Sequence, residues 1–469
     1  MKTSALVFFT VLLTFGLFSC TKDNPVPPDQ QPQINLTLED VSCTEAWLKL
    51  TTANITLPAD VVLLRDNFLI ETISLSSADT ILYVDSLLPN KTYNLSSIIQ
   101  SNNPPAGEAG QTIRSESLPI TTLDTTSHNF TWQTWTFGGD AGSCTLYDVA
   151  IINSPADEAG ENDIWAVGEI YLLDSLGQPD PNAYNAIHWD GLGWELSRIK
   201  TNACGGVEYP PIKAIFAFSS NDILFAHIDG SISHYDGMKF VNDCTLITQL
   251  NGSSNKIWGV DSNDFYVVSG NGFIAHYQYG HWSRIESGTD VDLKDIYGSS
   301  NGNELWTCGW SNQNGRVAVL KIKNNGVESI WDSQTNREFS YYYGGQLLNT
   351  LWANENAEFV FATGVVTRHS LLNKKILRYE WVPYLNGQKV LDLGNYAYRI
   401  RGSNKNNIFI VGDEAMVWHN NGETWHKFEE LQNFDDRLYG LAVTENMIVT
   451  VGIGYGNGLG EALILIGRR

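Results

Sequence analysis

The sequence contains few basic residues. Its 469 residues include 29 Lys and Arg against 52 Asp and Glu, so the formal net charge is −23 at pH 7. Affinity for DNA and RNA comes largely from Lys and Arg side chains that neutralise phosphate groups. A chain with this charge is therefore not expected to bind nucleic acid.

The motifs of common catalytic and metal sites are also absent. The sequence has no Cys-x-x-Cys pair, no His-Glu-x-x-His helix and no phosphate-cradling glycine loop. The alternating glycines from 452 to 458 are not followed by a helical pattern, which favours a hairpin turn over a nucleotide site. The sequence thus indicates no catalytic residue, no metal ligand and no cofactor.

The apolar stretch at the N-terminus is too short to cross a membrane. It runs from Ala5 to Phe18, follows Lys2 and ends at Ser19-Cys20, whereas a spanning helix needs about 20 apolar residues. A basic residue followed by a short apolar core is typical of a secretion signal. Residues 1–19 are therefore predicted to be a signal peptide.

The residues around Cys20 resemble the lipobox of bacterial lipoproteins. In that motif, here Leu17-Phe18-Ser19-Cys20, the cysteine is lipidated and the chain is cleaved before it. The next residues, Thr21-Lys22-Asp23-Asn24, are similar to the signal of surface-exported lipoproteins in Bacteroidota, and residues 20–33 as a whole form a Pro-rich linker. The resemblance implies an outer-membrane lipoprotein of the cell envelope, exposed at the surface, whose contact with the membrane is the lipid on Cys20.

A short pattern recurs between residues 162 and 422. Each copy has a head, in which Asn and an acidic residue precede an aliphatic and aromatic run, and most copies have a tail with an Asp-Gly or Asn-Gly turn. Successive heads are 39 to 59 residues apart, a spacing typical of four-stranded propeller blades. The heads are Asn162-Asp163-Ile164-Trp165, Asn221-Asp222-Ile223-Leu224, Asn263-Asp264-Phe265-Tyr266, Asn303-Glu304-Leu305-Trp306, Asn356-Ala357-Glu358-Phe359 and Asn406-Asn407-Ile408-Phe409, with a degenerate copy at Glu445-Asn446-Met447-Ile448.

The pattern predicts an all-β propeller over residues 128–469, with seven blades as the preferred count and six or eight as alternatives. The last unit stops before it can form a fourth strand. A matching strand instead precedes the first unit at Phe130–Phe137, and it resembles Glu423–Phe428. We expect this N-terminal strand to complete the final blade and so to remove an exposed edge.

Repetition also decides how the histidines are interpreted. His188, His234, His276 and His419 recur at one position of separate repeats. A residue that performs chemistry normally occurs once in a site, so these histidines are predicted to be architectural rather than metal ligands. The acidic residues of the heads are expected to fix the turn between the first two strands.

The cysteines allow one disulfide. Cys204 and Cys244 follow the fourth strands of adjacent repeats at similar positions, so a bridge between them is conceivable. Buried free thiols are the alternative.

Residues 34–124 resemble a fibronectin type III domain. Short alternating strands fill this segment, Leu88-Pro89-Asn90-Lys91-Thr92-Tyr93 resembles the family's tyrosine corner, and Trp47 takes the place of its buried tryptophan. The resemblance implies a single β-sandwich with Trp47 and Tyr93 in its core, which would serve as a spacer before the propeller.

The repeats also resemble those of sialidases and related BNR-type propellers. Asn420-Asn421-Gly422-Glu423-Thr424-Trp425 is similar to their Asp-box turn, and Tyr398-Arg399-Ile400-Arg401 partly matches their Arg-Ile-Pro motif, although Arg401 replaces the proline. Retaining sialidases also need an arginine triad and a Tyr/Glu pair over the central channel. The sequence shows no such triad, so a glycoside-active enzyme is kept as the alternative function.

Binding residues are expected where the repeat is interrupted, because inserted loops on one face of a propeller usually carry its binding site. Exposed aromatic residues on such loops can stack on sugars or anchor a protein, and packing between blades is their alternative role. We predict a binding module for a glycan, a peptide or an envelope protein; a purely structural, adhesin-like module is a third possibility. The candidate ligand-binding residues are Tyr341, Tyr342, Tyr343, Trp310 and Tyr209, together with the insertions at 169–184 and 332–350.

Overall fold

The computed structural model describes most of the chain after residue 30. The described ranges are 31–100, 112–152, 163–201, 204–250, 253–299, 302–324, 326–335, 348–353, 359–364, 370–373, 380–381, 384–385, 388–389, 393, 395–456 and 459–469. Strands dominate these ranges, which contain no α-helix and hence no helix long and apolar enough to cross a membrane. The predicted signal peptide, the predicted lipidation site Cys20 and the candidate residues Tyr341, Tyr342 and Tyr343 lie outside the described residues.

Contacts within the chain define two compact units. Among the described residues, the first unit contains 31–36, Leu50–Thr80, 95–100 and 112–117, and the second contains Thr37–Lys49, Ile81–Asn94 and the described residues from Leu118 to Arg469. The domain boundaries expected from the sequence, a sandwich over 34–124 and a propeller over 128–469, stay predictions.

The strands before residue 122 form two sheets. One has the order β1-β2-β5 and the other β4-β3-β6-β7, with β8 also paired to β6. Trp47 and Tyr93 are buried, as predicted. The backbone N–H of Leu88 donates a hydrogen bond to the Tyr93 hydroxyl oxygen (2.8 Å), which is the local bond expected of a tyrosine corner. The strands are β1 (Gln33–Val41), β2 (Ala46–Ala53), β3 (Ala59–Arg65), β4 (Phe68–Leu75), β5 (Asp79–Val84), β6 (Thr92–Gln100), β7 (Thr112–Arg114) and β8 (Leu118–Thr121).

Apart from the two-stranded sheet of β30 (Tyr384–Leu385) and β31 (Gln388–Lys389), the later strands form four-stranded antiparallel sheets, seven of them within the described residues. The first four sheets consist of β10 (Thr145–Ile152), β11 (Asp163–Ile170), β12 (Tyr184–Trp189) and β13 (Trp194–Ser197); β14 (Ile212–Ser219), β15 (Asp222–His227), β16 (Ile232–Tyr235) and β17 (Phe240–Asp243); β18 (Ser254–Asp261), β19 (Asp264–Ser269), β20 (Phe273–Gln278) and β21 (His281–Glu286); and β22 (Asp292–Gly298), β23 (Leu305–Trp310), β24 (Val317–Lys323) and β25 (Gly326–Asp332). The other three consist of β26 (Leu348–Ala353), β27 (Phe359–Gly364), β28 (Ser370–Asn373) and β29 (Glu380–Trp381); β32 (Ala397–Asn404), β33 (Asn407–Gly412), β34 (Val417–Asn420) and β35 (Trp425–Lys427); and β36 (Arg437–Val443), β37 (Met447–Gly454), β38 (Glu461–Arg468) and β9 (Thr131–Phe137).

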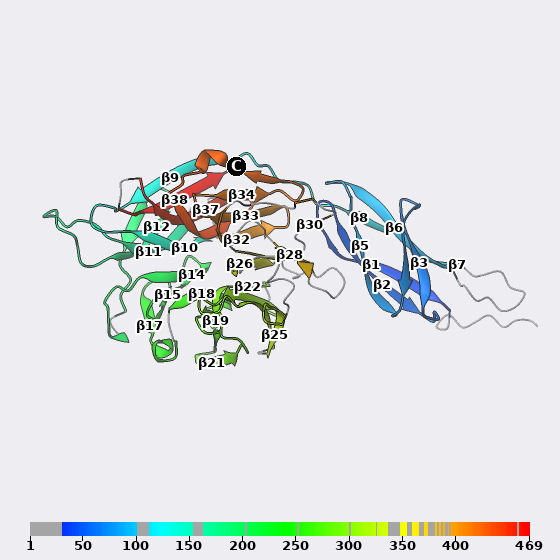
Figure 1. Cartoon of the computed structure of the whole chain (residues 1–469), viewed down its shortest axis with the longest axis horizontal. Coiled ribbons are helices and arrows are strands. Elements are labelled where there is room, and N and C mark those ends of the chain that lie inside the picture. Colours follow the sequence, from blue (N-terminus) through cyan, green and yellow to red (C-terminus); the bar gives the residue numbers. More distant parts are fainter. Residues whose placement is uncertain are drawn as a thin grey trace, which may run out of the picture. The chain divides into compact units, whose positions relative to one another are not determined.

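These sheets are arranged as a closed ring (Figure 1). The first strand of each sheet contacts the first strand of the next, in the order β10, β14, β18, β22, β26, β32 and β36, and β36 contacts β10. Apolar side chains pack between neighbouring sheets, as where Trp306 and Cys308 of β23 join a buried cluster with Leu351 of β26. The all-β fold class is therefore confirmed. The blade count stays a prediction, because the chain between β25 and β32 is only partly described.

The strand before the first repeat completes the last sheet, as predicted. β9 pairs with β38 along its whole length, from Thr131 opposite Arg468 to Phe137 opposite Ala462. Figure 1 shows the cyan β9 beside the red β38. The two ends of the ring are thus joined within one sheet, and β38 has no free edge.

The recurring histidines have the architectural role that the repeats predict. Each bonds from the third strand of its sheet to the head residue of the second strand, and three of them also stack on an aromatic ring of that head. The expectation that the acidic residues of the heads fix the turn between the first two strands is wrong. The carboxylates of the aspartates bond to histidines of the third strand. The pairs are His188–Asp163 (2.8 Å), His234–Asp222 (2.7 Å), His276–Asp264 (2.7 Å) and His419–Asn407 (3.1 Å).

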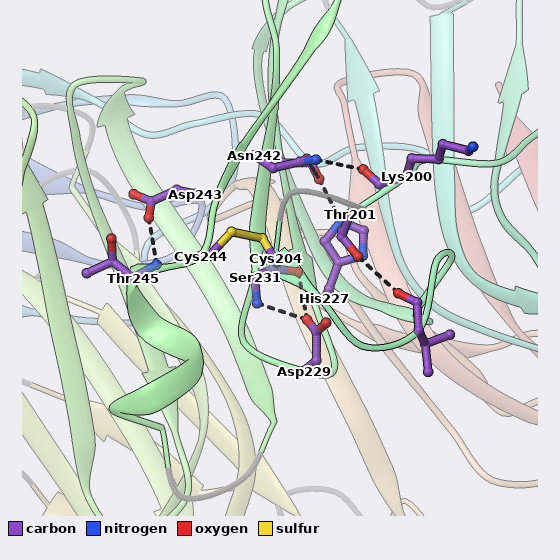
Figure 2. The surroundings of a disulfide bond; sticks show 12 residues. Lys200, Thr201, Cys204, His227, Asp229, Ser231, Asn242, Asp243, Cys244 and Thr245 are labelled. Carbon is purple, nitrogen blue, oxygen red and sulfur yellow. Dashed lines mark hydrogen bonds between the residues drawn. A yellow bond between two sulfur atoms is a disulfide. The ribbon is translucent and has the colours of Figure 1, made fainter.

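The disulfide that the sequence analysis considered between Cys204 and Cys244 is present. Cys204, between β13 and β14, makes a disulfide with Cys244, which directly follows β17. Beside it, Asn242 Nδ2 donates a hydrogen bond to the Lys200 carbonyl (2.9 Å), so two links join these neighbouring sheets (Figure 2). The other described cysteines are buried free thiols, the state that the sequence offered as the alternative to a disulfide. They are Cys43, Cys144 and Cys308.

One buried histidine near this disulfide is expected to make stability depend on pH. His227 is fully buried, its Nε2 lies 2.8 Å from Ser233 Oγ, and burial lowers its pKa to about 4. The unfolded chain therefore binds the proton more readily, so the contribution of His227 is complete above the unfolded pKa of about 6.5 and is lost as the pH falls towards 4. We expect a loss of about 2 kcal/mol in the free energy of unfolding at pH 5 relative to pH 7 from this residue.

Urea unfolding of the wild type and of His227→Gln at both pH values measures this contribution. The variant should lose correspondingly less stability on acidification, whereas His281→Gln at an exposed position should behave like the wild type. An equal loss in the wild type and in His227→Gln would refute the prediction.

Candidate binding site at the mouth of the central channel

The first strand of every described sheet of the ring contains a β-bulge near its start. In β10 the register against β11 shifts between Leu146 and Asp148, and β11 has no room for a side chain there, because a Cβ atom on Gly168 would lie 2.0 Å from the Thr145 carbonyl oxygen. Bulges at the rim of a closed sheet re-aim the extra residue. The bulged residues are Tyr147, Lys213, Asn255, Lys294, Asn349, Tyr398 and Tyr439.

Three bulged residues on consecutive strands of the ring are tyrosines. Tyr398 of β32 packs edge-on against Tyr439 of β36, with 4.9 Å between ring centroids, and Tyr439 lies 6.5 Å from Tyr147 of β10. All three side chains are half-buried. We call this group the tyrosine mouth, because it lies where the first strands begin.

The longer loops of the ring emerge on the same face. Since neighbouring strands are antiparallel, the face where first strands begin also carries the connections from second to third strands and from each fourth strand to the next sheet. The insertion at 169–184 is a connection of the first kind, and the segment around Tyr209 is one of the second kind. Trp310 ends a second strand and lies at this face too.

Tyr147 belongs to a charged network. Its hydroxyl donates to Glu169 Oε1 (2.5 Å), Tyr171 donates to the other carboxylate oxygen (3.1 Å), and the Lys213 ammonium lies 3.2 Å from the Tyr147 ring centroid. Burial and the neighbouring Glu169 raise the pKa of Tyr147, so its hydroxyl stays protonated at neutral pH. Burial lowers the pKa of Lys213 to about 8, partly offset by Glu169.

The other two tyrosines also lie beside charged groups. Burial raises the pKa of Tyr398, and so does the adjacent carboxylate of Asp413. Asp413 Oδ1 lies 3.4 Å from Arg437 Nε, and the Arg437 guanidinium is also hydrogen-bonded to Tyr439. The tyrosine mouth therefore combines aromatic rings and hydroxyls with an arginine, and Tyr and Arg are enriched at protein interfaces.

Below the tyrosine mouth, the first strands contribute five buried charges, the channel charge cluster. Asp148 pairs with Lys256, and Asp295 accepts hydrogen bonds from both Nη atoms of Arg401 (2.8 and 2.9 Å). Arg399 Nη1 lies 3.1 Å from the same carboxylate. Burial alone would raise the pKa of Asp295, but the two arginines lower it overall. All five side chains are at least nine-tenths buried.

The described candidates from the sequence are spread around the face rather than gathered in one site. Trp310 donates a hydrogen bond from Nε1 to Asn349 Oδ1 of the next sheet (3.0 Å), which is the packing between blades that the sequence left open. Tyr209 is half-buried, with the Lys200 ammonium 5.5 Å from its ring centroid.

The sequence analysis did not predict the tyrosine mouth. Aligning the first strands places Tyr147, Tyr398 and Tyr439 at one position, but an aromatic residue in a strand is ordinarily core. The bulge that changes their environment is a property of strand register, which the pattern of the heads does not reveal.

Comparisons with known proteins bear on the fold. No protein family matches the sequence, and no curated protein does. The solved structure of YCF48 bound to D1 peptide superposes with a TM-score of 0.51 at 12% identity, covering 74% of this chain and 97% of that chain. The chain contains a β-propeller. The WD40 propeller domain of Doa1 is a further structural match, with a TM-score of 0.44, 13% identity and coverage of 73% and 98%.

Proposed function

We propose that this chain is a surface-anchored envelope lipoprotein whose propeller binds an extended segment of another envelope protein at the tyrosine mouth. The observation that carries the proposal is the set of three adjacent, half-buried tyrosines, each at a bulge of a first strand and each beside a charged group. Tyrosine supplies a large contact area with little entropy cost, and it is enriched among the residues that dominate binding energy.

Two further features favour a protein segment as the ligand. The tyrosines stand on strands of the ring, which hold a binding surface more rigidly than loops do. In addition, a structure with the same fold was solved with a peptide bound.

The location outside the cytoplasm rests on the N-terminal sequence. The lipobox-like residues before Cys20 support lipidation, the sandwich-like strands would act as a spacer, and the Cys204–Cys244 disulfide is a bond that persists in oxidising compartments. Labelling of growing cells with radioactive palmitate should mark the wild type and not Cys20→Ser. Equal labelling of both proteins would contradict anchoring through Cys20.

Binding through the tyrosine mouth is tested by recovery of partners from solubilised envelopes. Tagged wild-type chain should retain one envelope protein through a defined segment, and Tyr398→Ala/Tyr439→Ala should lower the affinity at least about 30-fold, because a central interface residue contributes about 2 kcal/mol or more. Tyr279→Ala is the matched control, since Tyr279 is exposed at the turn after β20, on the opposite face. Equal retention by all three proteins would refute the site.

A glycoside-active propeller remains the second candidate, and one observation favours it. Tyr147 and Glu169 form the kind of Tyr/Glu pair that the chemistry requires, at the mouth of the channel. Two observations weigh against it: the pKa of Tyr147 is raised, and Arg399 and Arg401 are engaged by Asp295. Release of sugar from a glycan panel by the wild type, lost in Glu169→Gln, would support the enzyme and displace the binding proposal.

A further inference from the structure

The channel charge cluster is not electrically balanced. It contains three cations, Lys256, Arg399 and Arg401, against two carboxylates, Asp148 and Asp295. Burial, together with the two arginines, lowers the pKa of Lys256 to about 8, so most of its ammonium groups are charged at pH 7. One positive charge is therefore in excess in a buried region, where an uncompensated charge is costly.

A cavity lies beside the excess charge. It has a volume of about 280 Å³ and is bounded by first strands of the ring. Among the five charged residues of the cluster, only the cations Lys256 and Arg401 line it, and the two carboxylates do not. The remaining lining residues are mostly of apolar type, with Ile215, Ile257 and Ile296 among them, and polar as well as apolar atoms face the cavity. The cavity is thus a small, partly open space with positive charge on one side.

We propose that this cavity binds a small monovalent inorganic anion, such as chloride, attracted by the net positive charge at Lys256 and Arg401 while their ion pairs with Asp148 and Asp295 stay in place. The anion neutralises the excess charge of the channel charge cluster, and its attraction to that charge is stronger beside buried groups than it would be in bulk water. The site differs from the tyrosine mouth in position and in chemistry, and it does not depend on the proposed partner. Its effect is on the stability of the ring, because the folded state binds the anion and the unfolded chain does not.

Bromide is the direct probe. Crystals of the full chain grown in sodium bromide should show an anomalous peak in the cavity, within contact distance of Lys256 Nζ. A cavity without that peak at saturating bromide would overturn the proposal. This measurement needs no variant, so it holds even if a substituted chain fails to fold.

Thermal unfolding supplies the second test. In sodium chloride the wild type should unfold at a higher temperature than in sodium gluconate of equal ionic strength, by roughly 2 °C at ten times the dissociation constant. Lys256→Met leaves two cations against two carboxylates and should abolish the difference. Lys239→Met, which removes an exposed lysine, should retain it. The same difference in Lys256→Met as in the wild type would overturn the proposal.

Discussion

Replacing Asp295 by asparagine is expected to lower the free energy of unfolding by about 3–5 kcal/mol. The substitution keeps the size of the side chain but removes the charge that faces both Arg399 and Arg401. The two guanidinium groups, which reach Asp295 from β32 on the far side of β26, would remain buried without their carboxylate. Thr350, which donates to the same carboxylate from β26 (2.6 Å), would also lose its strong acceptor.

Urea unfolding at pH 7 measures this loss. Asp435→Asn is the matched control, because it makes the same chemical change at an exposed position and should alter stability by less than about 0.5 kcal/mol. If Asp295→Asn were as stable as the control, the cluster would not link β22, β26 and β32 in the way described here.

Replacing Thr131–Phe137 by a Gly/Ser segment of equal length is expected to abolish cooperative folding of the propeller. The substitution removes the strand that pairs with β38 and leaves an open edge in the ring. It also deletes Trp132 and Trp135, which pack against different apolar clusters on the two sides of that sheet. Loss of a packed tryptophan alone costs about 3–5 kcal/mol.

The register of β9 suggests a second variant in which the missing strand of the Gly/Ser chain is restored. Thr131 lies opposite Arg468, so a short Asn-Gly turn after Arg469 followed by the original residues 130–137 would enter the same position as a hairpin. Calorimetry should show a cooperative transition in the wild type and in the rescued chain, and none in the Gly/Ser variant. An unchanged transition in the Gly/Ser variant would show that β9 does not close the ring.

Most of the fold could be predicted from the repeat heads. Asn-acid-aliphatic runs and Asp-Gly turns are local signals, so the sheets and the exchange of the strand at Phe130–Phe137 could be predicted from the sequence. The recurrence of His188 and His276 likewise predicted an architectural role, although only the structure shows that the partner is the head acid. These contacts lie within single repeats, where sequence distance and spatial distance agree.

The site depends on contacts between distant repeats. Tyr147 and Tyr439 are almost 300 residues apart in the sequence, and they become neighbours only because β36 adjoins β10 in the closed ring. Asp295 and Arg401 are paired across two sheets in the same way. Trp310 was predicted to bind a ligand from an inserted loop, but it is the last residue of β23, and the sequence pattern does not show that its indole bonds to the next sheet.

The most direct test of the account is photo-crosslinking from the tyrosine mouth in living cells. A p-benzoylphenylalanine residue placed at Tyr439 should crosslink to one envelope protein, with the adducts confined to one segment of that protein, whereas the same residue placed at Tyr279 should not. The account is contradicted if both positions give the same products, or if position 439 gives none above the level at position 279.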